Sequence, residues 1–205
     1  LWAKKMQPES IGSKRYLEHV LDQAMDIIEA QEIEVLYTTS PVLEALALRM
    51  SDQKRMAVKG VHYGGISIGK EALKRFKVEN FPNAVHISGY GNTLFGLCLE
   101  IEGLSTYDLD YFPLGPRMIV QVVDKDDSNI SGSERLSKLV NYGEEGQVVF
   151  HRLDESFFVP NMFERDRAVR IPPTSTAVDY GITQDGVRNP KLLENNKVTV
   201  KTGLY

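Results

Sequence analysis

Hydrophobic residues recur at helical spacing near the start of the chain and in short β-branched runs after it. Across residues 13–31 they fall three or four positions apart, while the intervening positions are charged, which predicts an amphipathic helix. Residues 33–38 form a short β-branched run that predicts a strand. Ser40 offers a capping hydroxyl and Pro41 suits a first helical turn, so a second helix is expected through about residue 50.

The same alternation of strand and helix continues toward the middle of the chain. Residues 56–63 predict a strand, Ser67 can cap a helix through about Lys77, and residues 84–88 predict another strand. Strands joined by single helices pair in parallel through right-handed crossovers. Residues 33–93 are therefore expected to form part of a parallel sheet with covering helices, the pattern of an α/β fold.

The second half of the chain predicts mostly β structure. Residues 118–123 and 146–151 resemble strands with only a short helix, near residues 134–140, between them, so they are expected to pair antiparallel. Residues 172–196 are rich in Pro, Thr, Asn and Asp and predict a long surface excursion before a last strand at 198–201. The expected division is an α/β half over 1–104, a smaller β-rich subdomain over 105–171, and an extended tail with a terminal strand over 172–205.

Composition is that of an ordinary globular domain. The chain has 205 residues, of which 42% are hydrophobic and 25% charged, and its formal net charge is -4. Without a basic block, nucleic acid is not an expected partner. No apolar run is long enough to span a bilayer, and no signal peptide is evident, so we expect a cytoplasmic protein without membrane contact. The single cysteine, Cys98, lies in an apolar run and is expected to be a buried hydrophobe.

Two glycine clusters follow neighbouring predicted strands. Gly64-Gly65 comes after one strand, and the segment from Gly89 to Thr93 comes after the next. Ligands of open parallel sheets bind beyond the carboxyl ends of the strands, where backbone N–H groups are free. The clusters could together hold a nucleotide, with Tyr90 offering an aromatic face. Alternatively they are ordinary turn residues, because neither matches a Walker loop or a dinucleotide fingerprint.

Three segments together resemble a known family. They are the Gly64-Gly65 pair, the run Ile87-Ser88-Gly89-Tyr90-Gly91-Asn92-Thr93, and Gly143-Glu144-Glu145-Gly146-Gln147-Val148-Val149-Phe150 with the later Pro160-to-Asp166 stretch. In order and spacing, over about residues 30–171, they are similar to the adenylate-forming superfamily of acyl-coenzyme A synthetases, and most of all to phenylacetate–coenzyme A ligases.

The resemblance implies a nucleotide site. Gly64, Gly65 and Ile66 would line the adenine pocket, and Tyr90 would stack on the base. Asp166 would accept hydrogen bonds from the ribose hydroxyls. In such enzymes the oxygen of a carboxylic acid attacks the α-phosphate of ATP, which gives an acyl-adenylate, and the acyl group then passes to a thiol such as coenzyme A.

The resemblance also implies where the reacting groups would lie. Gly91, Asn92 and Thr93 would face the α-phosphate, with Thr93 as the catalytic contact. His62 or Tyr63, just before the glycine pair, would touch the acid. Positioning and charge neutralisation carry the rate of such reactions, so little acid–base chemistry is needed.

The sequence departs from the family pattern at several points. The magnesium-binding glutamate that normally follows the threonine is Leu94 here, and Leu94 cannot ligate a hard cation. Glu100 or Glu102 could replace it only from a different place on a strand. There is no triphosphate loop and no room for the usual carboxy-terminal lysine domain. The chain is then the later part of a longer ligase, one piece of a split enzyme, or a member that has lost the chemistry.

Two functions follow as expectations. The first is part of an AMP-forming ligase that joins an aromatic or other small carboxylic acid to a thiol. The alternative is a catalytically degenerate protein of the same fold that binds a nucleotide or acyl-adenylate. A third reading is an α/β module for subunit contact whose glycine loops bind nothing. Small molecules are the expected ligands, and either a homodimer or a complementary subunit is an open possibility for a partner chain.

Several other residues have plain structural interpretations. His62 and His86 occupy corresponding positions of adjacent predicted strands and could share a metal or a proton, but packing roles are the commoner case. His151 is expected to be structural. The arginine-rich segment 165–170 either faces a phosphate or forms a charged edge strand. The acidic segment 124–127 lacks the calcium-loop pattern and is expected to be a solvated hairpin tip.

Overall fold

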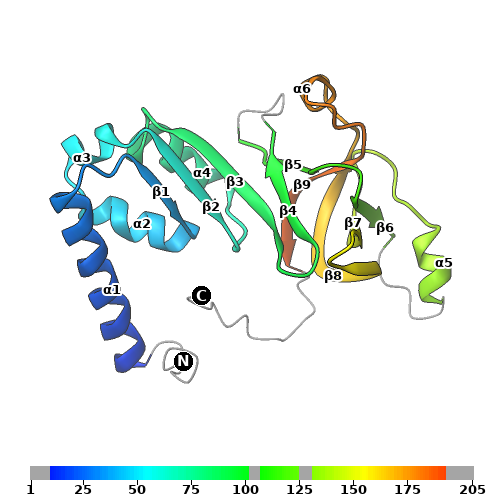
Figure 1. Ribbon diagram of the computed structural model, residues 1–205, viewed down its shortest axis with the longest axis horizontal. Coiled ribbons are helices and arrows are strands. Elements are labelled where there is room, and N and C mark those ends of the chain that lie inside the picture. The colour runs from blue at the N-terminus through cyan, green and yellow to red at the C-terminus, as the bar shows by residue number, and fades with distance from the viewer. Residues whose placement is uncertain (1–9, 102–106, 125–130, 193–205) are drawn as a thin grey trace.

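A single mixed sheet runs through the protein (Figure 1). The computed structural model describes residues 10–101, 107–124 and 131–192. Its nine strands lie in the order β1-β2-β3-β4-β5-β9-β8-β7-β6, so the parallel first half continues directly into the antiparallel second half. A mixed α/β architecture was the sequence prediction, and it is confirmed.

The parallel part of the sheet has the expected strand–helix–strand order. Strands β1, β2 and β3 pair in parallel, with Val61 opposite Leu36 and His86. Two predicted caps are wrong: Thr39 precedes the second helix, so Ser40 lies inside it, and Gly69 rather than Ser67 precedes the fourth. The elements are α1 (Ile11–Ala30), β1 (Val35–Thr38), α2 (Ser40–Arg49), α3 (Asp52–Ala57), β2 (Gly60–Gly64), α4 (Lys70–Arg75), a π-helical turn (Phe76–Asn80) and β3 (Val85–Asn92).

Strand β3 extends further than the sequence indicated. The glycines expected in a loop after residue 88 lie within the strand, which continues to Asn92 and turns back into β4 (Gly96–Glu100). Gly91 permits this close pairing, because a Cβ at that position would stand 2.0 Å from a backbone oxygen of β4. The segment from Tyr90 to Thr93 is therefore the arm and tip of a hairpin rather than an open loop.

The antiparallel half confirms the main prediction and corrects another. Strands β6 and β7 pair antiparallel, as expected from their alternation. Strand β9 was not predicted: it lies inside the sheet, between β5 and β8, so a surface excursion over residues 172–196 is wrong where the chain is described. The segment 198–201 and residues 125–127 lie outside the described residues, and the division into three parts stays a prediction. The remaining elements are β5 (Asp110–Pro113), β6 (Met118–Val123), α5 (Gly132–Leu136), β7 (Glu145–Leu153), β8 (Phe158–Ile171), α6 (Ser175–Asp179) and β9 (Gly186–Leu192).

A buried ion pair fixes β9 in its place. Asp110 of β5 is 0% exposed, and its two carboxylate oxygens accept hydrogen bonds from Arg188 of β9, at 2.6 Å to Nε and 2.8 Å to Nη2. This two-point geometry is the strongest that arginine makes with a carboxylate. Residues 78 positions apart are thereby joined at the centre of the sheet.

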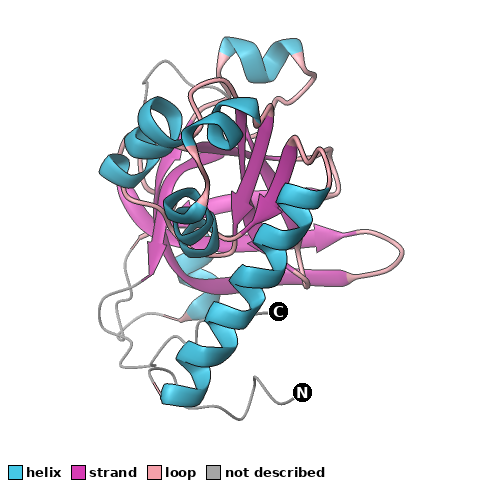
Figure 2. Ribbon diagram, turned by 90° about the vertical axis from the view of Figure 1, so that its left-hand side faces the viewer, coloured by secondary structure: helices cyan, strands magenta, loops and turns pink. Residues whose placement is uncertain are grey.

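The two faces of the parallel strands differ in burial. Leu36, Val61 and Tyr63 face the helices and are buried, because sequential right-handed crossovers place their helices on one side of the sheet. On the other face, Val35 and Tyr37 are 66% and 77% exposed, and no described helix covers them. Figure 2 shows the long helix α1 running obliquely in front of the strands.

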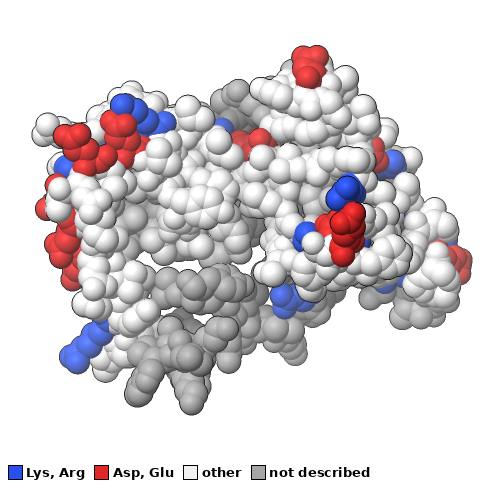
Figure 3. All heavy atoms as spheres, in the orientation of Figure 1, with Lys and Arg blue, Asp and Glu red and all other residues white. Residues whose placement is uncertain are grey.

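The surface carries charges of both signs. On the face drawn in Figure 3, basic and acidic side chains form small separate groups rather than one extended basic area. Among the residues that the structure describes, no helix has both the length and the apolar character needed to cross a membrane.

Candidate functional site

Two residues from distant predicted motifs meet at the end of β3. The Tyr90 hydroxyl donates a hydrogen bond of 3.0 Å to Oδ2 of Asp166, which lies 76 positions later on β8. Burial raises the pKa of Asp166, whereas the bond from Tyr90 and the charge of Arg165 act in the opposite direction. Among the described residues no partner is found for the second carboxylate oxygen of Asp166, which is therefore available to a ligand hydroxyl.

The ring of Tyr90 is held by other aromatic side chains. It lies 5.7 Å from the ring centroids of both Tyr111 and Phe150, at tilted angles, and it is only partly exposed. Burial, followed by the charge of Asp166, raises the pKa of Tyr90 far above its ordinary value, so the hydroxyl keeps its proton. Tyr90 is thus a fixed hydrogen-bond donor whose packing determines where Asp166 points.

The first glycine cluster lies one strand away from Tyr90. Gly64 is the last residue of β2 and is opposite Gly89 of β3. A Cβ at Gly64 would stand 2.8 Å from the backbone oxygen of Gly89, so the close approach of these strands requires glycine. Gly65 follows with a φ of 77° and, like the partly exposed Ile66, belongs to the connection that leaves the sheet at this end.

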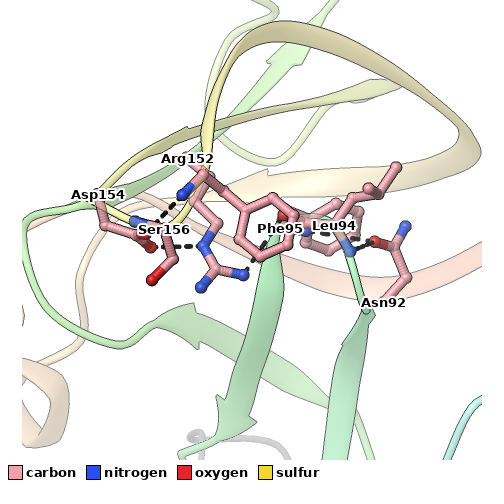
Figure 4. A network of polar contacts seen from close by, with 7 residues as sticks. Asn92, Leu94, Phe95, Arg152, Asp154 and Ser156 are labelled. Atoms are coloured by element: carbon pink, nitrogen blue, oxygen red, sulfur yellow. Dashed lines mark hydrogen bonds and ion pairs between the residues drawn. The ribbon is translucent and has the colours of Figure 1, made fainter.

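The hairpin tip after β3 is organised by Asn92. Its side-chain oxygen accepts hydrogen bonds from the N–H groups of Leu94, at 2.8 Å, and Phe95, at 3.3 Å. Figure 4 shows this tip beside Arg152, which pairs with Asp154 at 2.5 Å. Thr93 is exposed, and its hydroxyl has no hydrogen-bond partner among the described residues.

An open hollow adjoins the hairpin tip. It has a volume of about 480 Å³ and is lined by both apolar and charged side chains, among them Phe95, Leu97, Arg117 and Arg152. Phe95 stacks on Phe150 at a centroid distance of 3.5 Å, which holds the tip against β7.

The residues at this tip do not fit a magnesium ion. Leu94 is 48% exposed and offers no oxygen, and the side-chain oxygen of Asn92 is already used by two backbone N–H groups. Glu100 accepts hydrogen bonds from both Ser88 N and Ser88 Oγ and lies 3.6 Å from Lys77, so it is occupied elsewhere. Glu102 lies outside the described residues, and no group of three or more His, Cys, Asp or Glu side chains that could hold a metal occurs among the described ones.

The two residues predicted to touch an acid substrate lie on opposite faces of β2. Tyr63 is 1% exposed and packs against Phe76, and its buried hydroxyl has no hydrogen-bond partner within the part of the chain that the structure describes. His62 lies on the uncovered face, where the ring of Tyr37 stacks on it at 4.1 Å. His62 is near the glycine end, since a Cβ at Gly89 would stand 3.2 Å from its Nε2, and both of its ring nitrogens are buried without a hydrogen-bond partner among the described residues.

The remaining candidates have structural roles. His86 is opposite Val61, one position out of register with His62, so the two histidines face opposite sides of the sheet and cannot share a ligand. His86 bonds the Phe81 carbonyl at 3.0 Å, and His151 contacts Gln121 at 2.9 Å, as its structural interpretation predicted. Cys98 is fully buried, which raises its pKa to about 12 and confirms it as an unreactive hydrophobe.

Strand β8 is not the charged edge strand considered above. It pairs with β7 on one side and with β9 on the other. Glu164 was not predicted as a site residue; its Oε1 accepts a 3.0 Å hydrogen bond from Nδ2 of Asn92. Its position two residues before Asp166 was the one feature of the sequence that could have indicated a role in the site.

Comparison with solved structures identifies the architecture. The chain is similar to a 2-hydroxyisobutyryl-CoA ligase crystallised with 2-HIB-AMP and CoA, with a TM-score of 0.56 and 16% identity over 90% of this chain. It is also similar to a long-chain-fatty-acid-CoA ligase from Archaeoglobus fulgidus, with a TM-score of 0.50 and 13% identity over 84% of this chain. The protein has the fold of part of an acyl-CoA ligase.

The ligase fold is represented only in part. The chain spans 36% of the length of each of these two ligase chains. The chain is also similar to CmiS6, with 10% identity and a TM-score of 0.53, and it covers 42% of the length of that protein chain. No family model matches the sequence, and no curated protein matches it either.

Proposed function

We propose that the end of β3 binds the adenosine portion of ATP, AMP or an acyl-adenylate, as the nucleotide-binding part of an AMP-forming acid–thiol ligase. The observation that carries the proposal is the Tyr90–Asp166 hydrogen bond, which joins two motifs of the family pattern in one place. The free oxygen of Asp166 would accept from the ribose hydroxyls. The ligase fold and the 2-HIB-AMP and CoA bound in one similar structure support this choice of ligands.

The residues around Asp166 would each contact a different part of the nucleotide. Gly64, Gly65 and Ile66 would line one side of the base, and the partly exposed ring of Tyr90 would contact it. Gly91, Asn92 and Thr93 would face the α-phosphate, with the exposed Thr93 hydroxyl as donor.

The chemistry proposed is the attack of a carboxylate oxygen on the α-phosphorus of ATP, which forms an acyl phosphate bond and releases pyrophosphate. A thiol such as coenzyme A then attacks the acyl carbon and releases AMP. We assign the contact with the acid, an aromatic or other small carboxylic acid of the phenylacetate type, to His62, whose buried ring nitrogens lie beside Gly89 without a hydrogen-bond partner among the described residues. Tyr63 is buried and is not carried into the proposal.

The second candidate is a protein of this fold that binds an adenylate without turning it over. Leu94 favours it, because an exposed aliphatic side chain stands where a metal-binding carboxylate is expected.

Two measurements test these proposals. Isothermal titration with AMP and with adenosine should show saturable binding that Asp166→Ala weakens at least tenfold, and absence of binding by both ligands would refute both candidates. Acid-dependent release of pyrophosphate from ATP, in the presence of coenzyme A, then separates them: release supports the ligase, and AMP binding without release supports the non-catalytic protein.

A further inference from the structure

An irregularity in β8 brings a second carboxylate to the hairpin tip. The pairs Gln147–Arg167 and Val149–Phe163 are two residues apart on β7 but four apart on β8, so the intervening segment of β8 bulges. This bulge carries both Glu164 and Asp166. Asp166 reaches Tyr90, and Glu164 reaches Asn92, which is next to Thr93 in the chain.

Glu164 also determines which groups the tip can offer to a phosphate. Because Asn92 donates its amide N–H to Glu164, its side-chain oxygen is directed to the N–H groups of Leu94 and Phe95. Those two backbone donors are therefore occupied. The side-chain groups beside this tip are then the Thr93 hydroxyl, the Glu164 carboxylate bonded to Asn92, and Arg152. The guanidinium of Arg152 bonds the Leu94 carbonyl at 3.4 Å and is already paired with Asp154.

A negative charge is already unfavourable at this position. Burial, and next the charge of Asp166, raise the pKa of Glu164, against the effect of its bond from Asn92 and of Arg165. Gln147 donates to the backbone oxygen of Glu164 at 2.7 Å and supplies no positive charge. A phosphate placed at Thr93 would add a further like charge within the range of Coulomb repulsion.

We propose that Glu164 is a specificity-determining residue that makes the site favour adenosine derivatives with little negative charge at the 5′ position over AMP and ATP. An acyl-adenylate carries one negative charge on its phosphate, whereas AMP carries close to two at neutral pH. The site would thus retain the adenylate intermediate in preference to free nucleotides. This inference rests on the proposed function, because it assumes that adenosine binds between Tyr90 and Asp166.

The test compares the affinities of adenosine, AMP and 5′-O-sulfamoyladenosine, an uncharged analogue, for three proteins. Glu164→Gln removes the charge but keeps a side-chain oxygen that can accept from Asn92, so the tip should retain its geometry. Glu29→Gln is the control, since it removes one charge from an exposed position of α1. Thermal unfolding of each variant verifies that the fold is intact.

For the wild-type chain we expect adenosine and its sulfamoyl analogue to bind more tightly than AMP. Glu164→Gln should strengthen AMP binding about tenfold, as expected for removal of one like charge a few ångströms away in a partly solvated site, and should leave adenosine within twofold. Glu29→Gln should change neither affinity.

The results that would refute the role of Glu164 differ from the result that would refute the nucleotide site itself. If adenosine binds and Glu164→Gln leaves the ratio of the AMP and adenosine affinities unchanged, the role of Glu164 is refuted while the nucleotide site stands. An equal gain for both ligands refutes it in the same way. If none of the three ligands binds the wild-type chain, both the proposed function and this inference fail.

Discussion

Replacing Tyr90 with phenylalanine isolates the hydrogen bond on which the candidate site depends. The change removes one oxygen and keeps the ring contacts with Tyr111 and Phe150. A hydrogen bond to a charged group contributes about 1.5–3 kcal/mol. Since Tyr90 and Asp166 are both only partly buried, we expect a loss near the lower end, about 1.5–2 kcal/mol in the free energy of unfolding.

The assay is thermal and urea unfolding, with a matched control. For a chain of this size, 1 kcal/mol corresponds to roughly 2–4 °C in Tm, so Tyr90→Phe should lower Tm by about 3–8 °C. Tyr142→Phe is the control, because its hydroxyl also bonds a carboxylate, Asp185 at 2.9 Å, but at an exposed position where the loss should stay below about 0.5 kcal/mol.

A double-mutant cycle assigns the loss to the pair. In an Asp166→Asn background the hydroxyl of Tyr90 can still donate to a neutral oxygen, so its removal should cost only about 0.5–1.5 kcal/mol. Equal stability of Tyr90→Phe and Tyr142→Phe would show that Tyr90 makes no such bond and would refute the reasoning.

Three further changes test other parts of the structure. Gly91→Ala should destabilise the fold by about 2–4 kcal/mol, because the new Cβ would stand 2.0 Å from a backbone oxygen, as measured by urea unfolding. Arg188→Met should cost about 3–5 kcal/mol by leaving Asp110 buried without its partner. Burial lowers the pKa of His62 and His86, so the unfolded chain binds more protons, and stability should fall as pH drops below about 6.5.

Each of these changes has its own control. Gly69→Ala, where a Cβ has open space, should cost no more than about 1 kcal/mol, the loss of a glycine helix cap, beside Gly91→Ala. Adding Asp110→Asn to Arg188→Met should recover most of the loss, and failure to recover would argue against a buried pair. His62→Gln should flatten the acid dependence, whereas an unchanged profile would mean that its ring is already exposed to solvent.

The elements that could be predicted were those with strong local periodicity. The helix over α1 and the strand β6 follow from spacing alone, and the parallel pairing of β1 to β3 follows from short connections between them. Strand β9 could not be found this way, since it contains a proline and Asn189 with a φ of 50°, both typical of loops. Its position in the sheet is supported by the ion pair between Arg188 and Asp110, and no local sequence pattern predicts a contact between residues 78 positions apart.

Some residues of the candidate site could likewise be predicted from the sequence, and others could not. Tyr90 and Asp166 were named from their motifs as separate contacts to an adenosine, and those roles stay predictions. The hydrogen bond between the two side chains was not predicted. Glu164 could not be predicted because it contacts Asn92 from a bulge in β8, where this strand has two more residues than the paired segment of β7. A bulge depends on how two strands pair, so the sequence of β8 alone does not show it. Tyr63 was placed near a substrate because its position in sequence did not indicate which face of β2 it would occupy.

The most direct test of the central claim is a crystal structure of the chain with AMP or adenosine bound. We expect the ribose hydroxyls within hydrogen-bond distance of Asp166, the base between Gly65 and Tyr90, and the 5′ group at Thr93. A nucleoside bound elsewhere, or a ribose that does not contact Asp166, would contradict it.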